Sequence, residues 1–258
     1  MEKIKYINHW ERTLNDNCEL QYDFYGDNMT SFLLKIIGIV TMLCDHAGDS
    51  FIGHFSFLNL IGRIAFPIFA FQVVQGYIHT HNVKKYALRL FIFAFISQIP
   101  FMLFLSTFYD SYYLNIFFTL FLGVICLYGF DKIKNKYLGV LFAILICVVG
   151  HFIQVDYGAY GIAVIFIFYI FNKFWTNKKG LMCLAFIFIT ILKYLPNIIS
   201  YPSLYIYYVG YILFTCISLT PICVYNGKQG PKVKYLFYAF YPMHLLVIYI
   251  LNFALQIM

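Results

Sequence analysis

The sequence predicts an all-α fold, a polytopic transmembrane bundle of about nine helices. Of its 258 residues, 62% are hydrophobic and only 11% are charged, against roughly a quarter charged in an ordinary soluble domain. Apolar runs recur along the chain at close to the ~20 residues that a helix needs to cross a hydrocarbon core. Basic residues gather in every second connection between these runs, which is the pattern of a protein with alternating inner and outer loops.

The chain divides into a polar segment, 1–30, and an integral membrane domain, 31–258. The polar segment lacks a basic start followed by an apolar core, so it is not a secretory signal, and we expect it in the cytoplasm. Almost no chain is left for a soluble domain. The expected spans, in order, are 31–52, 56–79, 86–106, 113–130, 137–155, 159–175, 180–199, 203–223 and 236–256.

Charges between the spans give the orientation. Twelve of the fifteen Lys and Arg after residue 30 follow the second, fourth, sixth and eighth spans, whereas the alternate loops carry Asp49, Asp110 and Asp156. The positive-inside rule places the basic loops in the cytoplasm of a plasma-membrane protein, with the C-terminus outside if there are nine spans. The four basic clusters are Lys84, Lys85 and Arg89; Lys132, Lys134 and Lys136; Lys173, Lys178 and Lys179; and Lys228, Lys232 and Lys234.

Cysteine spacing gives no sign of a metal site. The seven cysteines show no Cys-x-x-Cys or Cys/His ligand spacing, so we interpret them as small buried hydrophobic residues and expect no bound metal. Glycine-rich phosphate loops are also absent. The partner indicated by composition is the lipid bilayer, and we expect no nucleic acid.

Ionisable residues inside the first two spans are the strongest functional signal. Asp45 and His46 end one apolar run and Arg63 lies within the next. An ionisable group at this depth costs on the order of 3 kcal/mol, so it is seldom kept unless it is paired or does chemistry. With the turn centred near His54, Asp45 and Arg63 lie at matching depth and can form a buried ion pair. Asp49, three residues after His46, can share its helical face.

A histidine held by a carboxylate beside an arginine is a plausible general base. The alternative is structural: Asp45 and Arg63 neutralise each other, and His46 bonds a helix carbonyl. The residues alone leave both interpretations open.

Motifs from residue 33 to about 250 resemble the TraX family, which is named for conjugal-transfer proteins that acetylate the N-terminus of pilin and is similar to polytopic acyl-CoA-dependent acyltransferases. The most specific motif is Gly-Arg-Ile-Ala-Phe-Pro at 62–67. The others are Leu-Lys-Ile-Ile-Gly at 34–38, Met-Leu-Cys-Asp-His-Ala-Gly at 42–48, Leu-Asn-Ile-Phe-Phe-Thr-Leu at 114–120, Asp-Tyr-Gly at 156–158, Tyr-Asn-Gly-Lys at 225–228 and Tyr-Pro-x-His at 241–244.

The resemblance implies that cytoplasmic acetyl-CoA is the acyl donor. Basic residues at the inner face would bind its phosphates through charge-assisted hydrogen bonds, although the positive-inside rule by itself explains these charges. A turn beside them would hold the nucleotide, and His244, eight residues into the last span, would lie at inner-leaflet depth against the CoA arm rather than do chemistry. The expected donor-binding residues are Lys84, Lys85, Arg89, His79, Tyr225, Asn226, Lys228 and His244.

The same reaction assigns roles to the embedded set. His46 would take the acceptor's proton, and Arg63 or Asn115 would stabilise the oxyanion. A covalent acetyl-imidazole on His46 is the alternative route. Asp49, Asp156 and Tyr157 would meet the acceptor at the outer mouth, although an ordinary solvated loop also explains Asp156 and Tyr157.

We therefore expect an integral membrane acetyltransferase whose acceptor is an amine or hydroxyl, on a peptide N-terminus or a glycan. A transporter or permease with an intramembrane ionisable pathway is the alternative, and a membrane assembly factor is a third. A transporter of the repeat type would show paired broken helices in two related halves, and the sequence shows no such repeat.

Overall fold

The computed structural model describes residues 29–107, 112–231 and 234–257. The polar segment 1–30 therefore falls almost entirely outside the described residues, as does Lys232. Within the described part the chain is all-α and contains no β-strand, only one isolated β-bridge between Leu114 and Val155.

Nine helical rods occupy the nine ranges predicted as spans, within the described residues. The elements, in order, are α2 (Ser31–Ala47) with the π-helical turn η1 (Gly48–Ile52), α3 (Phe57–Gly62) with α4 (Ala65–His79), α5 (Val83–Leu105), α6 (Ile116–Lys132), α7 (Lys136–Phe152), α8 (Gly158–Phe174), α9 (Lys179–Ser200), the 3₁₀ turn η2 (Pro202–Leu204) with α10 (Tyr205–Ile217) and α11 (Leu219–Cys223), and α12 (Lys234–Ile257). Six of these rods are long and apolar enough to cross a membrane, and α7 and α8 are shorter apolar helices. The protein is a multi-pass membrane protein.

Side-chain caps set where the rods begin. Thr30 accepts the backbone N–H of Leu33 at the start of α2, and Asn82 does the same for Lys85 at the start of α5. Asn115 accepts the N–H of Phe117 ahead of α6. Each cap satisfies a backbone donor that the first helical turn leaves unpaired, and in an apolar medium such a donor is costly to leave open.

Two rods are interrupted, which the sequence analysis did not anticipate. The second rod breaks between α3 and α4, four residues before Pro67, and the eighth breaks at Ser218 between α10 and α11, shortly before Pro221. Proline has no N–H to donate to the carbonyl four residues earlier, so neither helix continues through these positions with full hydrogen bonding. The first of these breaks fixes the position of Arg63.

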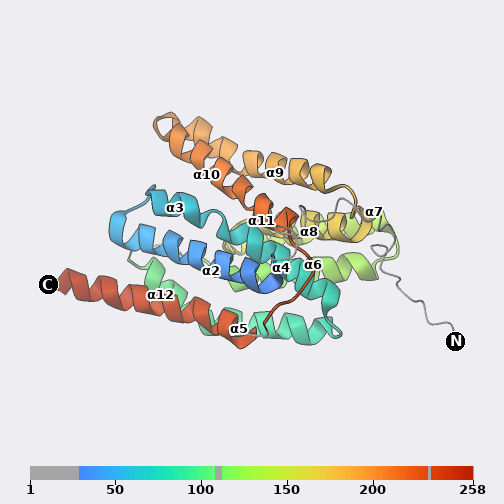
Figure 1. Ribbon diagram of the computed structural model, residues 1–258, viewed down its shortest axis with the longest axis horizontal. Coiled ribbons are helices and arrows are strands. Elements are labelled where there is room, and N and C mark those ends of the chain that lie inside the picture. The colour runs from blue at the N-terminus through green and yellow to red at the C-terminus, as the bar shows by residue number, and fades with distance from the viewer. Residues whose placement is uncertain (1–28, 108–111, 232–233, 258) are drawn as a thin grey trace, which may run out of the picture.

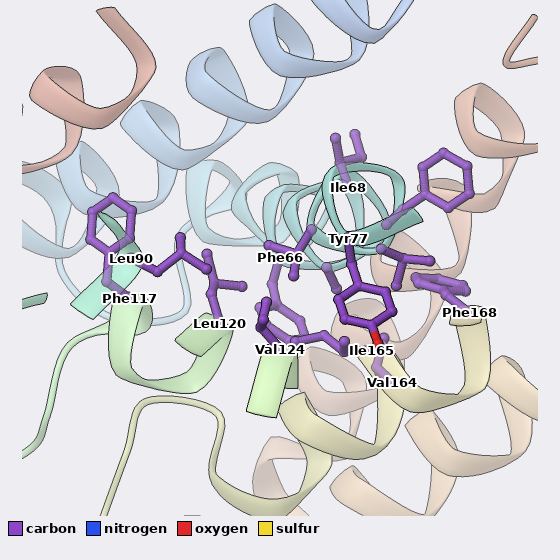
Figure 2. Close-up of a cluster of buried hydrophobic side chains, with 14 of the residues drawn as sticks. Phe66, Ile68, Tyr77, Leu90, Phe117, Leu120, Val124, Val164, Ile165 and Phe168 are labelled. Atoms are coloured by element: carbon purple, nitrogen blue, oxygen red, sulfur yellow. The ribbon is translucent and has the colours of Figure 1, made fainter. Parts of the chain in front are cut away.

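The core lies around α4, which contacts α2, α6, α8 and α11. Figure 2 shows its face towards α6 and α8, where Phe66 and Tyr77 from α4 meet Val124 and Ile165. The outer helices instead expose large apolar side chains along their length, such as Leu184, Phe188 and Ile199 on α9. Buried aromatic packing inside and apolar side chains outside are what a bundle in lipid requires.

The rods alternate in direction, so the four basic clusters belong to connections at one end of the bundle, which we call the basic end. Figure 1 shows the α2–α3 connection, the α9–α10 connection and the C-terminal end of α12 at the opposite end, which we call the hairpin end. Which end faces the cytoplasm stays a prediction.

Candidate active site

A buried ion pair joins the first two rods. Arg63 Nη2 lies 2.6 Å from Asp45 Oδ1, and their side chains are 20% and 13% exposed. Gly62 permits this approach, because a Cβ there would overlap the Asp45 carboxyl group. The predicted pair across the hairpin is confirmed.

The break in the second rod holds the arginine in place. Arg63 is the C-cap residue of α3, and its Nε donates to the Asn59 carbonyl at 3.2 Å. The guanidinium also lies over the Tyr211 ring, 4.9 Å from its centroid, which is cation–π distance. Arg63 is thus clamped between a carboxylate, a backbone oxygen and an aromatic face.

Asn59 ties the two rods together next to the pair. Its Nδ2 lies 3.0 Å from the Asp45 carbonyl and 2.9 Å from Asp49 Oδ1. Asn59 N–H also donates to Ser56 Oγ and Asn59 Oδ1 accepts the Ser56 N–H, which closes a capping box. Asn59 is not among the residues predicted from the sequence, although an amide in an apolar run is a signal of the same kind as Asp45.

Asp49 does not face His46. Its Oδ1 lies 2.9 Å from His54 Nδ1 and accepts from Asn59. The expectation that Asp49 shares the face of His46 assumed a continuous α-helix, but from Gly48 the chain forms a π-helical turn with a different angle per residue. The carboxylate therefore points to α3 and the turn.

His46 has another histidine as its partner. His46 Nδ1 lies 2.7 Å from His244 Nε2, and the two rings meet edge to edge in nearly one plane, with centroids 5.0 Å apart and planes 15° apart. His46 is half-buried, whereas His244 is 6% exposed. Phe104 and Tyr241 complete the surroundings of His46, with ring centroids at 5.0 and 6.5 Å.

This contact corrects the expected depth of His244. The sequence predicts inner-leaflet depth, because His244 comes soon after the start of the last span. Counting residues gives a depth only where helices start at the same level, and α12 is longer than α2 and projects past the turn that follows α2 (Figure 1). His244 thus lies at the level of His46.

Asn115 has its amide fully used. Its Nδ2 lies 2.7 Å from the Ala94 carbonyl and 2.8 Å from Gln98 Oε1, while its Oδ1 caps α6. The side chain is completely buried. Both amide hydrogens are engaged, so this geometry favours a structural role over the oxyanion contact we expected.

Asp156 and Tyr157 lie on the bundle side of the α7–α8 connection. Asp156 N–H donates to the Leu114 carbonyl at 2.7 Å, and the Tyr157 ring stacks on Phe66, centroids 3.9 Å apart. Lys193 Nζ lies 5.4 Å from the Tyr157 ring centroid. Burial raises the pKa of Asp156 to about 6, a shift that Lys193 partly opposes. These two residues are therefore packed near Arg63 rather than forming a loose solvated loop.

The expected donor-binding residues lie at the basic end, except for His244, which lies beside His46. Lys84, Lys85 and His79 are exposed, and His79 Nδ1 lies 2.8 Å from the Gln75 carbonyl. Arg89 is half-buried, and its Nε is a buried nitrogen without a hydrogen-bond partner among the described residues. A buried, unpaired guanidinium nitrogen suits an anionic ligand.

The α11–α12 connection forms the expected turn. Asn226 Oδ1 accepts the Lys228 N–H at 2.8 Å, and Gly227 between them has a φ of +78°. Tyr225 borders a cavity of about 190 Å³. The cavity is also lined by Trp175, Lys179 and Asn172. Within the described chain, no group of three or more His, Cys, Asp or Glu is placed to hold a metal ion.

Comparison with known proteins gives a family. The TraX protein family model matches residues 31–252, which confirms the resemblance of the motifs. The chain is 30% identical to the probable fimbrial assembly protein FimC, serogroup H1, of Dichelobacter nodosus, over 84% of this chain and 93% of that protein. It is 28% identical to an uncharacterized protein of Rickettsia prowazekii (strain Madrid E), over 64% of this chain and 66% of that protein. No solved structure matches.

Proposed function

Since this chain belongs to the TraX family, we propose that it is an integral membrane acetyltransferase that moves the acetyl group of acetyl-CoA to an amine or hydroxyl acceptor. The observation that carries the proposal is the placement of a half-buried histidine, His46, directly after the carboxylate of the Asp45–Arg63 pair. A base and a fixed cation in one water-poor site are the two elements that acyl transfer needs.

The reaction at His46 balances without any further group. The acceptor nitrogen or oxygen attacks the thioester carbonyl while His46 takes its proton. The new C–N or C–O bond forms, the C–S bond breaks, and the protonated imidazole returns the proton to the CoA thiolate. General-base transfer of this kind contributes roughly 10²- to 10⁴-fold. An acetyl-imidazole intermediate on His46 is the alternative route.

Arg63 is the better candidate for the oxyanion. Its guanidinium is held by Asp45, Asn59 and Tyr211, so it is organised before the reaction begins, which is what electrostatic stabilisation requires. Asn115 is not retained in this role because both of its amide hydrogens are engaged.

The donor would enter along the seam between α5 and α12. Arg89 begins this line at the basic end, and one turn further Phe93 stacks on Tyr238, centroids 4.8 Å apart. Tyr241, one turn beyond Tyr238, lies against His46. A pantetheine arm whose phosphates bind at Arg89 and the Lys84, Lys85 and Lys228 cluster would follow this seam to the histidine.

The acceptor would approach from the opposite end, past Asp49, Asp156 and Tyr157. Aromatic and carboxylate groups together suit a peptide amine, with a glycan hydroxyl as the second choice. A relative's name, fimbrial assembly protein, favours a peptide of the pilin type.

The interrupted rods are the one observation that favours a transporter. Broken helices that contact one another, as α3 does α10 and α4 does α11, also occur in transporters. They belong here to the second and eighth rods and not to matching positions in two repeats, so we rank this function second.

A turnover assay with a histidine variant tests the proposal. Purified protein in lipid nanodiscs should release CoA from labelled acetyl-CoA and label a peptide with a free N-terminus, but not the same peptide with a blocked N-terminus. His46→Ala should lower the rate at least about 10²-fold, the usual loss for a general base. His151→Ala, at an exposed position, is the matched control and should keep the wild-type rate.

Absence of turnover by the wild-type protein with peptide or glycan acceptors would reject the enzyme. Uptake of a solute that depends on His46 would instead favour the transporter.

A further inference from the structure

The two site histidines form a hydrogen-bonded chain that ends on the backbone. His244 Nδ1 lies 2.8 Å from the Phe240 carbonyl oxygen, one helical turn earlier on α12. Its other nitrogen, Nε2, lies 2.7 Å from His46 Nδ1. Among the described residues, three of the four ring nitrogens of the pair thus have a hydrogen-bond partner, and none is found for His46 Nε2.

The hydrogen bond to the Phe240 carbonyl determines which ring nitrogens of the two histidines carry a hydrogen. A carbonyl oxygen can only accept, so His244 Nδ1 carries a hydrogen. A neutral imidazole has a single N–H, which leaves His244 Nε2 as an acceptor. His46 Nδ1 must then donate to it, and His46 Nε2 is the nitrogen with a free lone pair.

A charged His244 would reverse this assignment, but its surroundings oppose the charge. The ring is 6% exposed and lies nearly parallel to the rings of Phe240 and His46, with planes 13° and 15° from its own. None of the ion pairs among the described residues includes it. A buried imidazolium without a carboxylate partner is strongly disfavoured.

We propose that His244 is a positioning residue: it fixes His46 in the tautomer whose bare Nε2 is the base. The inference rests on the proposed function. A base histidine is commonly oriented by a carboxylate, whereas here a second imidazole, anchored on a backbone carbonyl, takes that place. Asp45 on α2 is then available to hold Arg63, while His244 on α12 orients His46.

During transfer the Nδ1 hydrogen stays on His46. The acceptor's proton arrives at Nε2 and leaves from Nε2 to the CoA thiolate. His244 accepts one hydrogen bond throughout and never needs to change its protonation. An uncharged acceptor of similar reach should therefore replace it.

Two variants separate positioning from other roles. In His244→Gln the Oε1 atom can still accept a hydrogen bond from His46 Nδ1, but the side chain cannot titrate. The kcat should therefore stay within about tenfold of wild type, because only part of the rate gained from general-base transfer by His46 is lost. His244→Leu removes the acceptor, and kcat should fall about 10²- to 10⁴-fold, as in other sites where the base histidine loses its orienting partner. The KM for acetyl-CoA should change little in both. Met243→Leu, at an exposed neighbouring position, is the control and should match wild type.

Nitrogen-15 spectra of histidine-labelled protein in nanodiscs give a readout that needs no activity. His46, identified by the signals lost in His46→Ala, should show a protonated Nδ1 and a bare Nε2 in wild type and in His244→Gln. If His244→Leu does not fold, the wild-type and glutamine spectra still decide the tautomer.

A wild-type spectrum with the proton of His46 on Nε2, or a leucine variant with full kcat, would overturn the inference. If the wild type turns over no acetyl-CoA but shows the expected tautomer, the proposed function fails and the geometry stands. If it turns over acetyl-CoA and the leucine variant equals it, only the role of His244 fails.

Discussion

Two aspartates among the described residues pair with an Arg or a Lys, at opposite ends of the bundle, and the two pairs are built differently. Asp45–Arg63, at the hairpin end, has a 2.6 Å contact and side chains 13% and 20% exposed. Asp131–Lys173, at the basic end, has a 2.8 Å contact and side chains 24% and 41% exposed. The second carboxylate also accepts from Tyr77 and Tyr169, at 2.9 and 2.5 Å.

The two pairs differ in the residues that lie next to them. The Asp45–Arg63 pair adjoins a histidine on the same helix, whereas the partners described for Asp131 are two phenols and an ammonium, which are ties between α4, α6 and α8. The same type of charge pair therefore belongs to the proposed active site in one place and to a helix junction in the other. Variants at the two pairs should affect different measurements.

The largest effect is expected at the Asp45–Arg63 pair. Arg63→Leu strands a buried carboxylate and removes the fixed cation, so the rate should fall about 10²- to 10³-fold and the unfolding free energy by about 3 to 5 kcal/mol. Asp45→Asn should act in the same direction. Turnover and thermal unfolding measure the two effects, and the double variant should show strong coupling. Strictly additive losses would contradict a functional pair.

The next largest effect is expected at the basic end, on the KM for acetyl-CoA. Arg89→Ala should raise the KM for acetyl-CoA about tenfold with kcat nearly unchanged, because phosphate contacts bind ground and transition states alike. Lys136→Ala, in another basic cluster at the same end, is the control and should leave KM unaltered. A fall in kcat with KM constant would place Arg89 outside the donor site.

The Asp131–Lys173 pair should affect stability alone. Lys173→Met should lower the unfolding free energy by no more than about 1 kcal/mol, because its ammonium is largely exposed. Activity of the folded fraction should equal wild type. A large loss of turnover without a loss of stability would contradict a purely structural role for the Asp131–Lys173 pair.

Asp156 gives the smallest effect, one that depends on pH. Its pKa in the folded protein, about 6, lies above the ordinary value of 3.8. As pH rises through this window the unfolded chain releases the proton first, so the fold loses stability and the loss is complete above pH 6. Asp156→Asn should therefore be more stable than wild type by on the order of 1 kcal/mol near pH 7 and equal near pH 4. Thermal unfolding of both proteins at the two pH values is the measurement, and a variant less stable near pH 7 would contradict the shift.

The sequence predicted the rods and one contact of the site, and the reason is geometric. Composition and run length determine where helices cross a bilayer, and Asp45 and Arg63 flank one short turn, so counting from the turn placed them together. The His46–His244 contact joins residues 198 positions apart, and the offset between α2 and α12 depends on packing across the whole bundle. The relative positions of α2 and α12 along the bundle therefore cannot be predicted from local sequence patterns.

The break at Arg63 was open to prediction from the residues. Pro67 cannot donate to the Arg63 carbonyl, which favours a break there, although α5, α9 and α12 continue through Pro100, Pro196 and Pro242. The π-helical turn after Gly48 has no comparable signal, and it is the feature that turned Asp49 away from His46. Local chemistry thus explains the position of Arg63, whereas the orientation of Asp49 follows only from the fold.

The contact of His46 on the first rod with His244 on the last rod has a consequence for synthesis. The hairpin that pairs Asp45 with Arg63 is complete once the ribosome has made residue 79, whereas His46 receives its partner only after α12 has been inserted. If the proposed function holds, a nascent chain would have the ion pair but lack the oriented base, so it would not react with acetyl-CoA while membrane insertion is still under way. Assembly order would thereby make the finished bundle the first form of the protein that is able to react.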